Sequence, residues 1–325
     1  MAKRRVDLRL ISMIACSRKL SKEAFFFNNN QIVMPAMETL ALLFIIFSAL
    51  MHALWNLMVK QSRDKTIFIW WMFLSSWSMM TLLTAGLGLF PRLTLHLVLL
   101  AAAAAICFVL YHWLGGFAYR EGDLSVTYPL AQTAMLYVPI WGVLFLGEQL
   151  SLIGVAGIVL IALGAYCIQL RGLSLEEILR PFTQLGNRSV QAALLAGFTY
   201  SIGSVIDKTG VDSYSAYQFT YVLVFFMFSF MSLNLLRPRY QGRILGEWRQ
   251  NPKLILWSGP VIMASFLSFR FGLQLAPVSY AVPVRQVSLL IGVLIGLLFL
   301  GESFGRIRLT SVGLILAGVF LVWQG

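Results

Sequence analysis

Two arginines are the residues best placed to do chemistry, because both fall inside long apolar stretches. Arg270 follows "ASFLSF", and Arg285 lies within "VSYAVPVRQVSLL". A guanidinium at the centre of a bilayer costs at least about 2.5–3.5 kcal/mol, so such a residue faces a cavity or a partner. In a cavity it would bind a carboxylate, phosphate or phosphonate through charge-assisted, often bidentate hydrogen bonds.

The alternative for both arginines is a structural role, with the guanidinium bonded to helix-end carbonyls or to Glu302. Arg285 adjoins Gln286 and Pro283, polar and helix-breaking residues that favour the cavity. For Arg270 the two interpretations are equal.

Gln132 and Gln286 form a second pair of candidate binding residues. Each follows a proline by three positions, Pro129 and Pro283 respectively. Proline removes a helix hydrogen bond and frees a carbonyl, which membrane helices tolerate best beside a cavity. We expect the two amides on opposite walls of one site. The alternative is a structural contact between helices, worth about 0.6 kcal/mol per hydrogen bond.

A third group of polar and aromatic residues lies near the start of the apolar part of the chain. His52, Trp55, Asn56 and Val59 are spaced to share one helix face. His52 titrates near neutral pH when unperturbed and would then couple transport to protons, although a packing role is the favoured interpretation. A further aromatic set is formed by Tyr111, His112 and Trp113. These residues belong either to a cavity wall or to an aromatic belt at the membrane interface.

Acidic residues and cofactor motifs are notable for where they do not occur. Every carboxylate in or beside an apolar segment is predicted near a segment end: Glu38, Glu148, Asp207 and Glu302. Glu148 is expected to contact the start of the next helix. A cavity with Arg285 and no central carboxylate is positive, which favours an anionic substrate. Neither a nucleotide-binding loop nor an HExxH zinc motif is present, so we predict no cofactor, no metal and no enzymatic activity.

These residues must be positioned by membrane-spanning helices. The 325-residue chain is 59% hydrophobic and only 12% charged, whereas soluble domains carry about 25% charged residues. About 20 apolar residues span a bilayer. The sequence therefore predicts an all-α integral membrane protein with spans at 39–60, 66–88, 93–117, 124–146, 151–170, 190–208, 214–236, 254–275, 278–300 and 307–323.

The positive charge of the chain is distributed in a tail and in loops. Residues 1–36 form a predicted basic tail that is not required for function, and the rest of the net charge of +12 lies mostly in short loops. Loop charge of this kind orients membrane proteins, and no basic stripe interleaved with aromatics indicates nucleic-acid binding. The predicted partners are a small-molecule substrate and the lipid bilayer, not nucleic acid, and the oligomeric state stays open.

An internal repeat organises the spans. A shift of 154 positions superposes Ser125, Pro129, Gln132 and Gly142 on Ser279, Pro283, Gln286 and Gly296, and it superposes two "LFLGE" segments. A weaker match at a shift of 148 pairs Lys60 and Asp64 with Lys208 and Asp212. Each repeat holds about five spans, and an odd number inverts the second copy. Inverted repeats with a midplane site between them are typical of secondary transporters.

These features resemble the EamA family of the drug/metabolite transporter superfamily, through "HALWNLMVK" (52–60) and the paired "LFLGE" segments. The resemblance implies two five-helix repeats, at 38–170 and 190–325, and a carrier in the plasma membrane that works by alternating access without ATP. The alternatives are a lipid-carrier flippase and a non-transporting membrane scaffold or sensor.

The sidedness of the membrane insertion stays open. Loops after odd-numbered spans hold 14 lysines and arginines, against 2 after even-numbered spans. This count places both termini outside the cytoplasm, whereas the family resemblance implies that both are inside.

Overall fold

The computed structural model describes residues 37–168, 170, 172, 174–235, 240, 242–300 and 305–325. These residues belong to one compact unit, Pro35–Gly325, and every regular element among them is helical. The predicted all-α membrane fold is confirmed. The predicted tail at 1–36, together with Glu302, lies outside the described residues.

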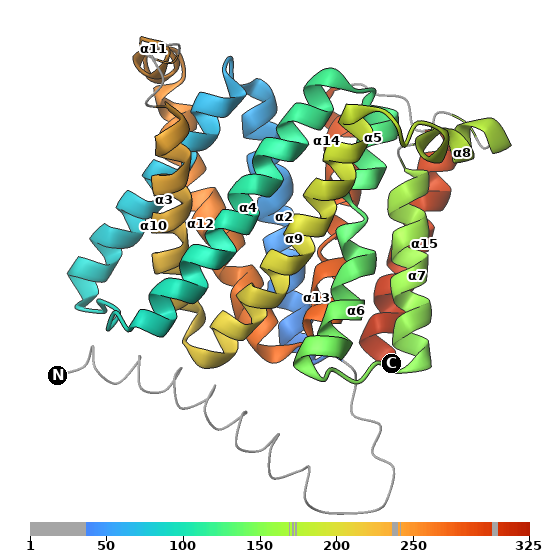
Figure 1. The fold of residues 1–325 in the computed structure, drawn as a ribbon, viewed down its shortest axis with the longest axis horizontal. Coiled ribbons are helices and arrows are strands. Elements are labelled where there is room, and N and C mark those ends of the chain that lie inside the picture. Colours follow the sequence, from blue (N-terminus) through green and yellow to red (C-terminus); the bar gives the residue numbers. More distant parts are fainter. Residues whose placement is uncertain are drawn as a thin grey trace, which may run out of the picture. The chain divides into compact units, whose positions relative to one another are not determined.

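Ten crossings are present in the described part of the chain, in two sets of five (Figure 1). The first set is α2 (Thr39–Gln61), α3 (Lys65–Leu87), α4 (Leu95–Glu121), the pair α5 (Leu124–Ala131) and α6 (Ala134–Leu146), and α7 (Leu152–Cys167). The second set is α9 (Arg188–Ser213), α10 (Ala216–Leu235), α12 (Pro252–Leu275), the pair α13 (Val278–Val284) and α14 (Val287–Leu300), and α15 (Arg306–Gln324).

The 154-residue shift also relates the helix ends. The last residues of α4 and α6, Glu121 and Leu146, correspond to Leu275 and Leu300, where α12 and α14 end. Packing follows the same relation: α4 lies along α9 as α12 lies along α2, and α10 contacts α4 as α3 contacts α12. Each repeat therefore completes the other across a pseudo-two-fold axis, as the inverted repeat predicts.

The fifth crossings, α7 and α15, meet on glycines and lie side by side in Figure 1. A Cβ on Gly157 would lie 2.6 Å from the Gly318 carbonyl oxygen, and one on Gly164 would lie 2.8 Å from the Ser311 carbonyl oxygen. The two contacts are equivalent under the 154-residue shift, because Gly157 corresponds to Ser311 and Gly318 corresponds to Gly164. Small residues allow such a close approach of two membrane helices.

The fourth crossing of each repeat is broken, which differs from the continuous spans predicted at 124–146 and 278–300. Pro129 lies inside α5 and Pro283 inside α13, and each helix stops soon afterwards. After Pro283, whose nitrogen cannot donate a helix hydrogen bond, the chain passes through a tight turn in which the Gln286 N–H donates to the Pro283 carbonyl at 2.9 Å. Gln132 and Gln286 sit at these two breaks.

Two predicted helix ends were too early, because charged residues mark the membrane boundary and not the end of a helix. α4 continues past Arg120 to Glu121. α9 continues to Ser213 through an ion pair of Lys208 with Asp212 at 2.9 Å. The longer α9 places Asp207 inside the helix and not near its end.

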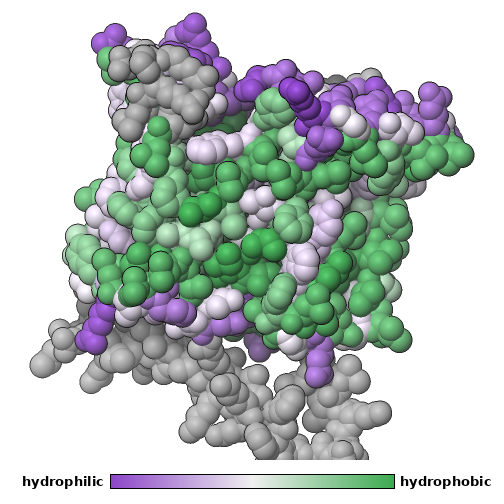
Figure 2. All heavy atoms as spheres, viewed as in Figure 1, coloured by the Kyte–Doolittle hydropathy of each residue, from purple (hydrophilic) through white to green (hydrophobic). Residues whose placement is uncertain are grey.

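Short amphipathic helices occupy the two longest polar gaps: α8 (Leu175–Thr183) and α11 (Arg243–Gln250). α8 exposes Leu175, Leu179 and Phe182 on one face, a pattern typical of a helix that lies in the membrane interface. Figure 2 shows an apolar belt between two polar rims, as a multi-pass membrane protein requires.

Candidate functional site

A cavity of about 1810 Å³ enters the bundle from one side. Its outer lining comes from the end of α2, the start of α3, the end of α4 and α11. None of the described connections at the opposite ends, 88–94, 147–151, 214–215 and 276–277, contributes to the lining. The mouth is basic, with six cations against two carboxylates: Lys60, Arg63, Lys65, Arg120, Arg243 and Arg308 against Asp64 and Glu247.

Arg285 lies at the inner end of this cavity, where α13 ends. Its guanidinium is 4.3 Å from the centroid of the Phe269 ring. Its hydrogen bonds are all long, to His52 Nδ1 at 3.3 Å, Ser265 Oγ at 3.4 Å and the Tyr200 hydroxyl at 3.5 Å. Its buried Nε has no partner among the described residues. Arg285 thus retains much of its capacity to donate hydrogen bonds.

His52 and Trp55 support Arg285 from α2. The Trp55 indole N–H donates to His52 Nδ1 at 3.1 Å, and the Arg285 guanidinium reaches the same nitrogen. Both partners are donors only, so Nδ1 is an acceptor and the imidazole is neutral. This geometry fits positioning of Arg285 better than proton coupling. Asn56, on the same helix, is exposed to the cavity.

Gln132 and Gln286 touch each other and do not stand on opposite walls. The Gln286 Nε2 donates to Gln132 Oε1 at 3.0 Å, because the breaks in α5–α6 and α13–α14 meet near the pseudo-two-fold axis. Both residues still line the cavity. The alternative interpretation, a contact between helices, is therefore present, and ligand binding by the two amides stays a prediction.

Arg270 is neutralised by a carboxylate. Its Nε donates to Asp207 Oδ1 at 2.8 Å, with side chains only 4% and 2% exposed. The guanidinium also lies 5.1 Å from the Phe266 ring centroid. This carboxylate lies on α9, at a position predicted near a helix end, and was not among the expected partners. Of those, Glu302 lies outside the described residues, and the Arg270 Nη1 also donates to the Phe266 carbonyl at 3.4 Å.

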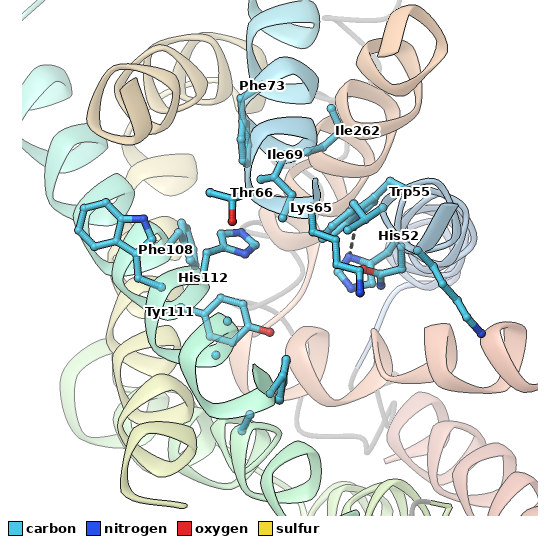
Figure 3. Close-up of a pocket in the computed structure, with 18 of the residues that line it drawn as sticks. His52, Trp55, Lys65, Thr66, Ile69, Phe73, Phe108, Tyr111, His112 and Ile262 are labelled. Carbon is cyan, nitrogen blue, oxygen red and sulfur yellow. Dashed lines mark hydrogen bonds between the residues drawn. The ribbon is translucent and has the colours of Figure 1, made fainter. Parts of the chain in front are cut away.

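Aromatic rings surround the space in front of Arg285. Tyr111 and His112 extend from α4 toward the cavity, facing His52 and Trp55 on α2 (Figure 3). The rings of Tyr111 and Tyr200 are 5.0 Å apart. The cavity wall is therefore the better interpretation for Tyr111 and His112.

Three residues that contact Arg285 were not predicted from the sequence: Tyr200, Ser265 and Phe269. Aromatic and hydroxyl side chains are common in membrane helices, and no spacing distinguishes these three. Asp207 did carry a signal, since it precedes Lys208 in the repeat-matched segment.

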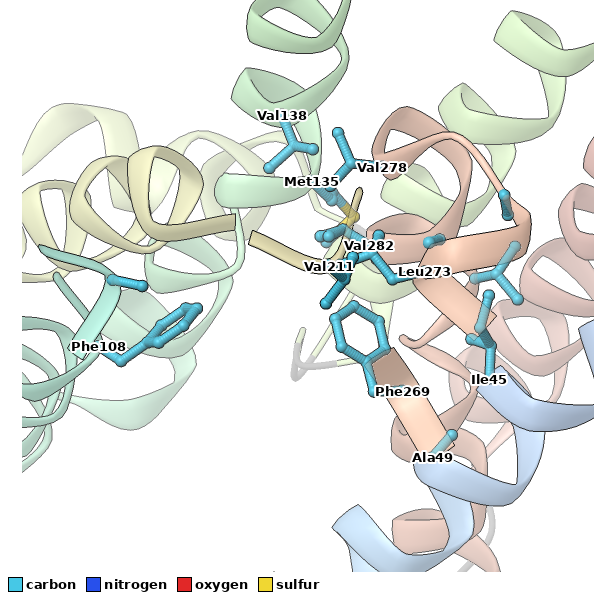
Figure 4. Packing of buried hydrophobic residues seen from close by; sticks show 14 of the residues in the cluster. Ile45, Ala49, Phe108, Met135, Val138, Val211, Phe269, Leu273, Val278 and Val282 are labelled. Carbon is cyan, nitrogen blue, oxygen red and sulfur yellow. The ribbon is translucent and has the colours of Figure 1, made fainter. Parts of the chain in front are cut away.

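Beneath the cavity the opposite side of the bundle is closed. Phe269, Leu273 and Val211 pack together there (Figure 4). The Gln274 amide donates to the Val211 carbonyl at 2.8 Å and to the Tyr214 carbonyl at 3.1 Å, and Lys208 donates to the Leu273 carbonyl at 2.9 Å.

Glu148 also belongs to the closed side, with a partner that differs from the expected one. Its carboxylate accepts from the N–H groups of Val278 and Ser279 at 2.6 and 3.0 Å. It therefore binds the start of α13 in the other repeat and not the start of α7, whose N-cap is Ser151. An anion at a helix N-terminus satisfies the first N–H groups.

Metal-binding potential is absent from the described residues, where no group of three or more His, Cys, Asp or Glu side chains is close enough to hold an ion. Cys107 and Cys167 are free thiols.

Comparison with known proteins agrees with this architecture. A search of curated proteins finds no match. A solved crystal structure superposes with a TM-score of 0.66 at 13% sequence identity, over 87% of this chain and 96% of the other, which shows the shared fold. The model of the EamA-like transporter family matches residues 39–170 and 187–324. The chain therefore belongs to the EamA-like transporter family, whose members are membrane transporters and not enzymes.

Proposed function

We propose that this chain is a secondary transporter that moves a small anionic metabolite across the plasma membrane by alternating access. The observation that carries the proposal is Arg285, a half-buried side chain at the inner end of a one-sided cavity, with long hydrogen bonds and a buried Nε that has no partner among the described residues. A bound carboxylate, phosphate or phosphonate would supply the missing acceptor and offset the cost of the buried charge.

The mouth of the cavity supports the same substrate class. Six cationic side chains against two carboxylates produce a positive potential that attracts anions and raises their local concentration. The inverted repeats support alternating access, because exchanging the conformations of two related halves would open the closed side and close the open one.

The test is uptake by purified protein in proteoliposomes, across a panel of carboxylates, phosphates and phosphonates with neutral and cationic controls. Arg285→Gln removes the charge and is expected to lower uptake of the accepted anion by roughly tenfold or more, since a charge-assisted hydrogen bond is worth about 1.5–3 kcal/mol. Arg285→Lys restores the charge without the planar fork, and we expect only partial rescue.

Arg120→Gln is the matched control, because Arg120 is exposed at the mouth and pairs with its neighbour Glu121. It should change uptake far less than Arg285→Gln. Wild-type uptake by Arg285→Gln, or a cation as the only accepted solute, would overturn the proposal and leave Arg285 as a structural residue.

A further inference from the structure

Three formal charges lie at the inner end of the cavity among the described lining residues: Arg270, Arg285 and Asp207. The remaining charged lining residues belong to the mouth. His52 is neutral, because its Nδ1 accepts from donors only. His112 makes ring contacts with Trp55, Phe73 and Tyr111 and pairs with no described carboxylate, so a proton there would add a second uncompensated cation. The inner site therefore carries a net charge of +1.

Asp207 and Arg270 cancel each other by direct contact at 2.8 Å, away from solvent. Arg285 has no carboxylate within salt-bridge distance among the described residues, and it rests against the same turn of α12, through Ser265 and Phe269. The inner site thus offers one net positive charge to a ligand. Without the Asp207 carboxylate, its net charge would be +2.

All three charged residues belong to the second repeat, and none has a charged counterpart in the first. At the shift of 154, Arg285 corresponds to Ala131 and Arg270 to Gly116, and at the shift of 148 Asp207 corresponds to Val59. The first repeat lacks both cations and the carboxylate alike. Fold symmetry does not require any of the three charges, since uncharged residues serve at the matched positions.

We propose that Asp207 sets the charge of the transported ligand at minus one, so that the site accepts a singly charged anion in preference to a doubly charged one. This rests on the proposed function above and adds a specificity-determining residue to it. A monoanion brings the inner site to neutrality. A dianion of the same shape leaves one uncompensated negative charge beside the Asp207 carboxylate, in a region of low dielectric constant, and is disfavoured by roughly tenfold or more.

Three variants separate charge from structure. Asp207→Asn raises the inner charge to +2, Arg270→Gln lowers it to zero, and the double variant returns it to +1 with an uncharged hydrogen-bonding pair in place of the ion pair. The probes are matched pairs of equal shape at neutral pH: succinate with succinamate, and phthalate with phthalamate. Uptake into proteoliposomes and thermal stabilisation in detergent are measured for each probe.

We expect wild-type protein to take up the monoanion of each accepted pair in preference to the dianion. Asp207→Asn should shift the ratio of monoanion to dianion uptake at least tenfold toward the dianion. Arg270→Gln should lose affinity for both. The double variant should regain the wild-type ratio, which loss of folding would not produce. If Asp207→Asn does not accumulate, Arg270→Gln and the double variant still provide the comparison.

The outcomes of this experiment distinguish the role of Asp207 from the proposed anion transport. Equal uptake of monoanions and dianions by the wild-type protein, or a ratio in Asp207→Asn that equals the wild-type ratio, overturns the role of Asp207 and leaves anion transport standing. Failure of wild-type protein to take up any anion overturns both.

Discussion

Two hydrogen bonds in the cavity join side chains on helices from different repeats. His52 of the first repeat accepts from Arg285 of the second, and Gln132 accepts from Gln286. Each of these bonds joins segments that are far apart in the sequence. Single substitutions should therefore affect the relation between the repeats as well as ligand binding.

The glutamine pair gives a direct test at the scale of residues. Gln132→Leu and Gln286→Leu each remove one partner of the same hydrogen bond, so their effects on unfolding free energy should not add. We expect a coupling of about 0.6 kcal/mol in a double-mutant cycle, the average for hydrogen bonds between membrane helices. Unfolding in mixed detergent measures it, and strictly additive losses would show that the bond contributes nothing in the membrane protein.

The sequence indicates the charged and amide residues of the site because polar atoms are conspicuous in apolar spans. Arg285, Gln132 and Gln286 are recognised in this way. Phe269 and Tyr200 are not, because their importance comes from the rotation of α12 and α9 toward Arg285, which only packing determines. Asp207 was misplaced since its neighbour Lys208 suggested a helix end.

At the scale of elements, the close packing of α7 against α15 can be tested by substitution. Both helices approach through backbone atoms at Gly157 and Gly318, where a Cβ would lie within 2.6 Å of a carbonyl oxygen on the partner. The shared glycine pattern, and not apolar area, brings them together. Overpacking at such a contact typically costs about 1–3 kcal/mol.

We therefore expect Gly157→Ala to lower the thermal unfolding temperature of the purified protein. Gly313→Ala is the matched control, because Gly313 lies on α15 and a Cβ there meets nothing within 4 Å. Thermal unfolding followed by intrinsic fluorescence measures both. Equal temperatures for the two variants would mean that α7 and α15 separate without cost.

Hydropathy and the internal repeat predict the number and order of the membrane-spanning segments and the inversion of the second repeat. They do so because the length of the apolar segments and the matched positions of Pro, Gln and Gly can be read directly from the sequence. They do not predict the breaks at 132–133 and 285–286. A proline inside an apolar run is compatible with a kinked or a broken helix, and the outcome depends on what fills the gap, here the two glutamines.

At the scale of the whole molecule, the described residues form a bundle that is open on its basic side and sealed on the other. Lys208 and Gln274 join the end of α9 to the end of α12 through three hydrogen bonds to carbonyls. Removing these bonds should favour a state that is open on the opposite side.

We expect Lys208→Met combined with Gln274→Leu to have opposite effects on two reporter cysteines. Val278→Cys, buried at the closed end, should react faster with a bulky maleimide, and Thr66→Cys, exposed at the mouth, should react more slowly. Labelling rates in nanodiscs, in a background without Cys16, Cys107 and Cys167, measure both. Faster reaction at both positions would indicate loosening and contradict alternating access.

The hydrogen bond between Gln132 and Gln286 joins two residues that correspond to each other in the two repeats. Under exchange of the two repeats it maps onto itself with donor and acceptor interchanged, and a carboxamide serves equally in either role. An ion pair placed there would not survive the exchange, because its charges would fall on the wrong repeats. If the two repeats exchange conformations as proposed, the amide pair can stay in place, and its hydrogen bond keeps the same energy in either conformation.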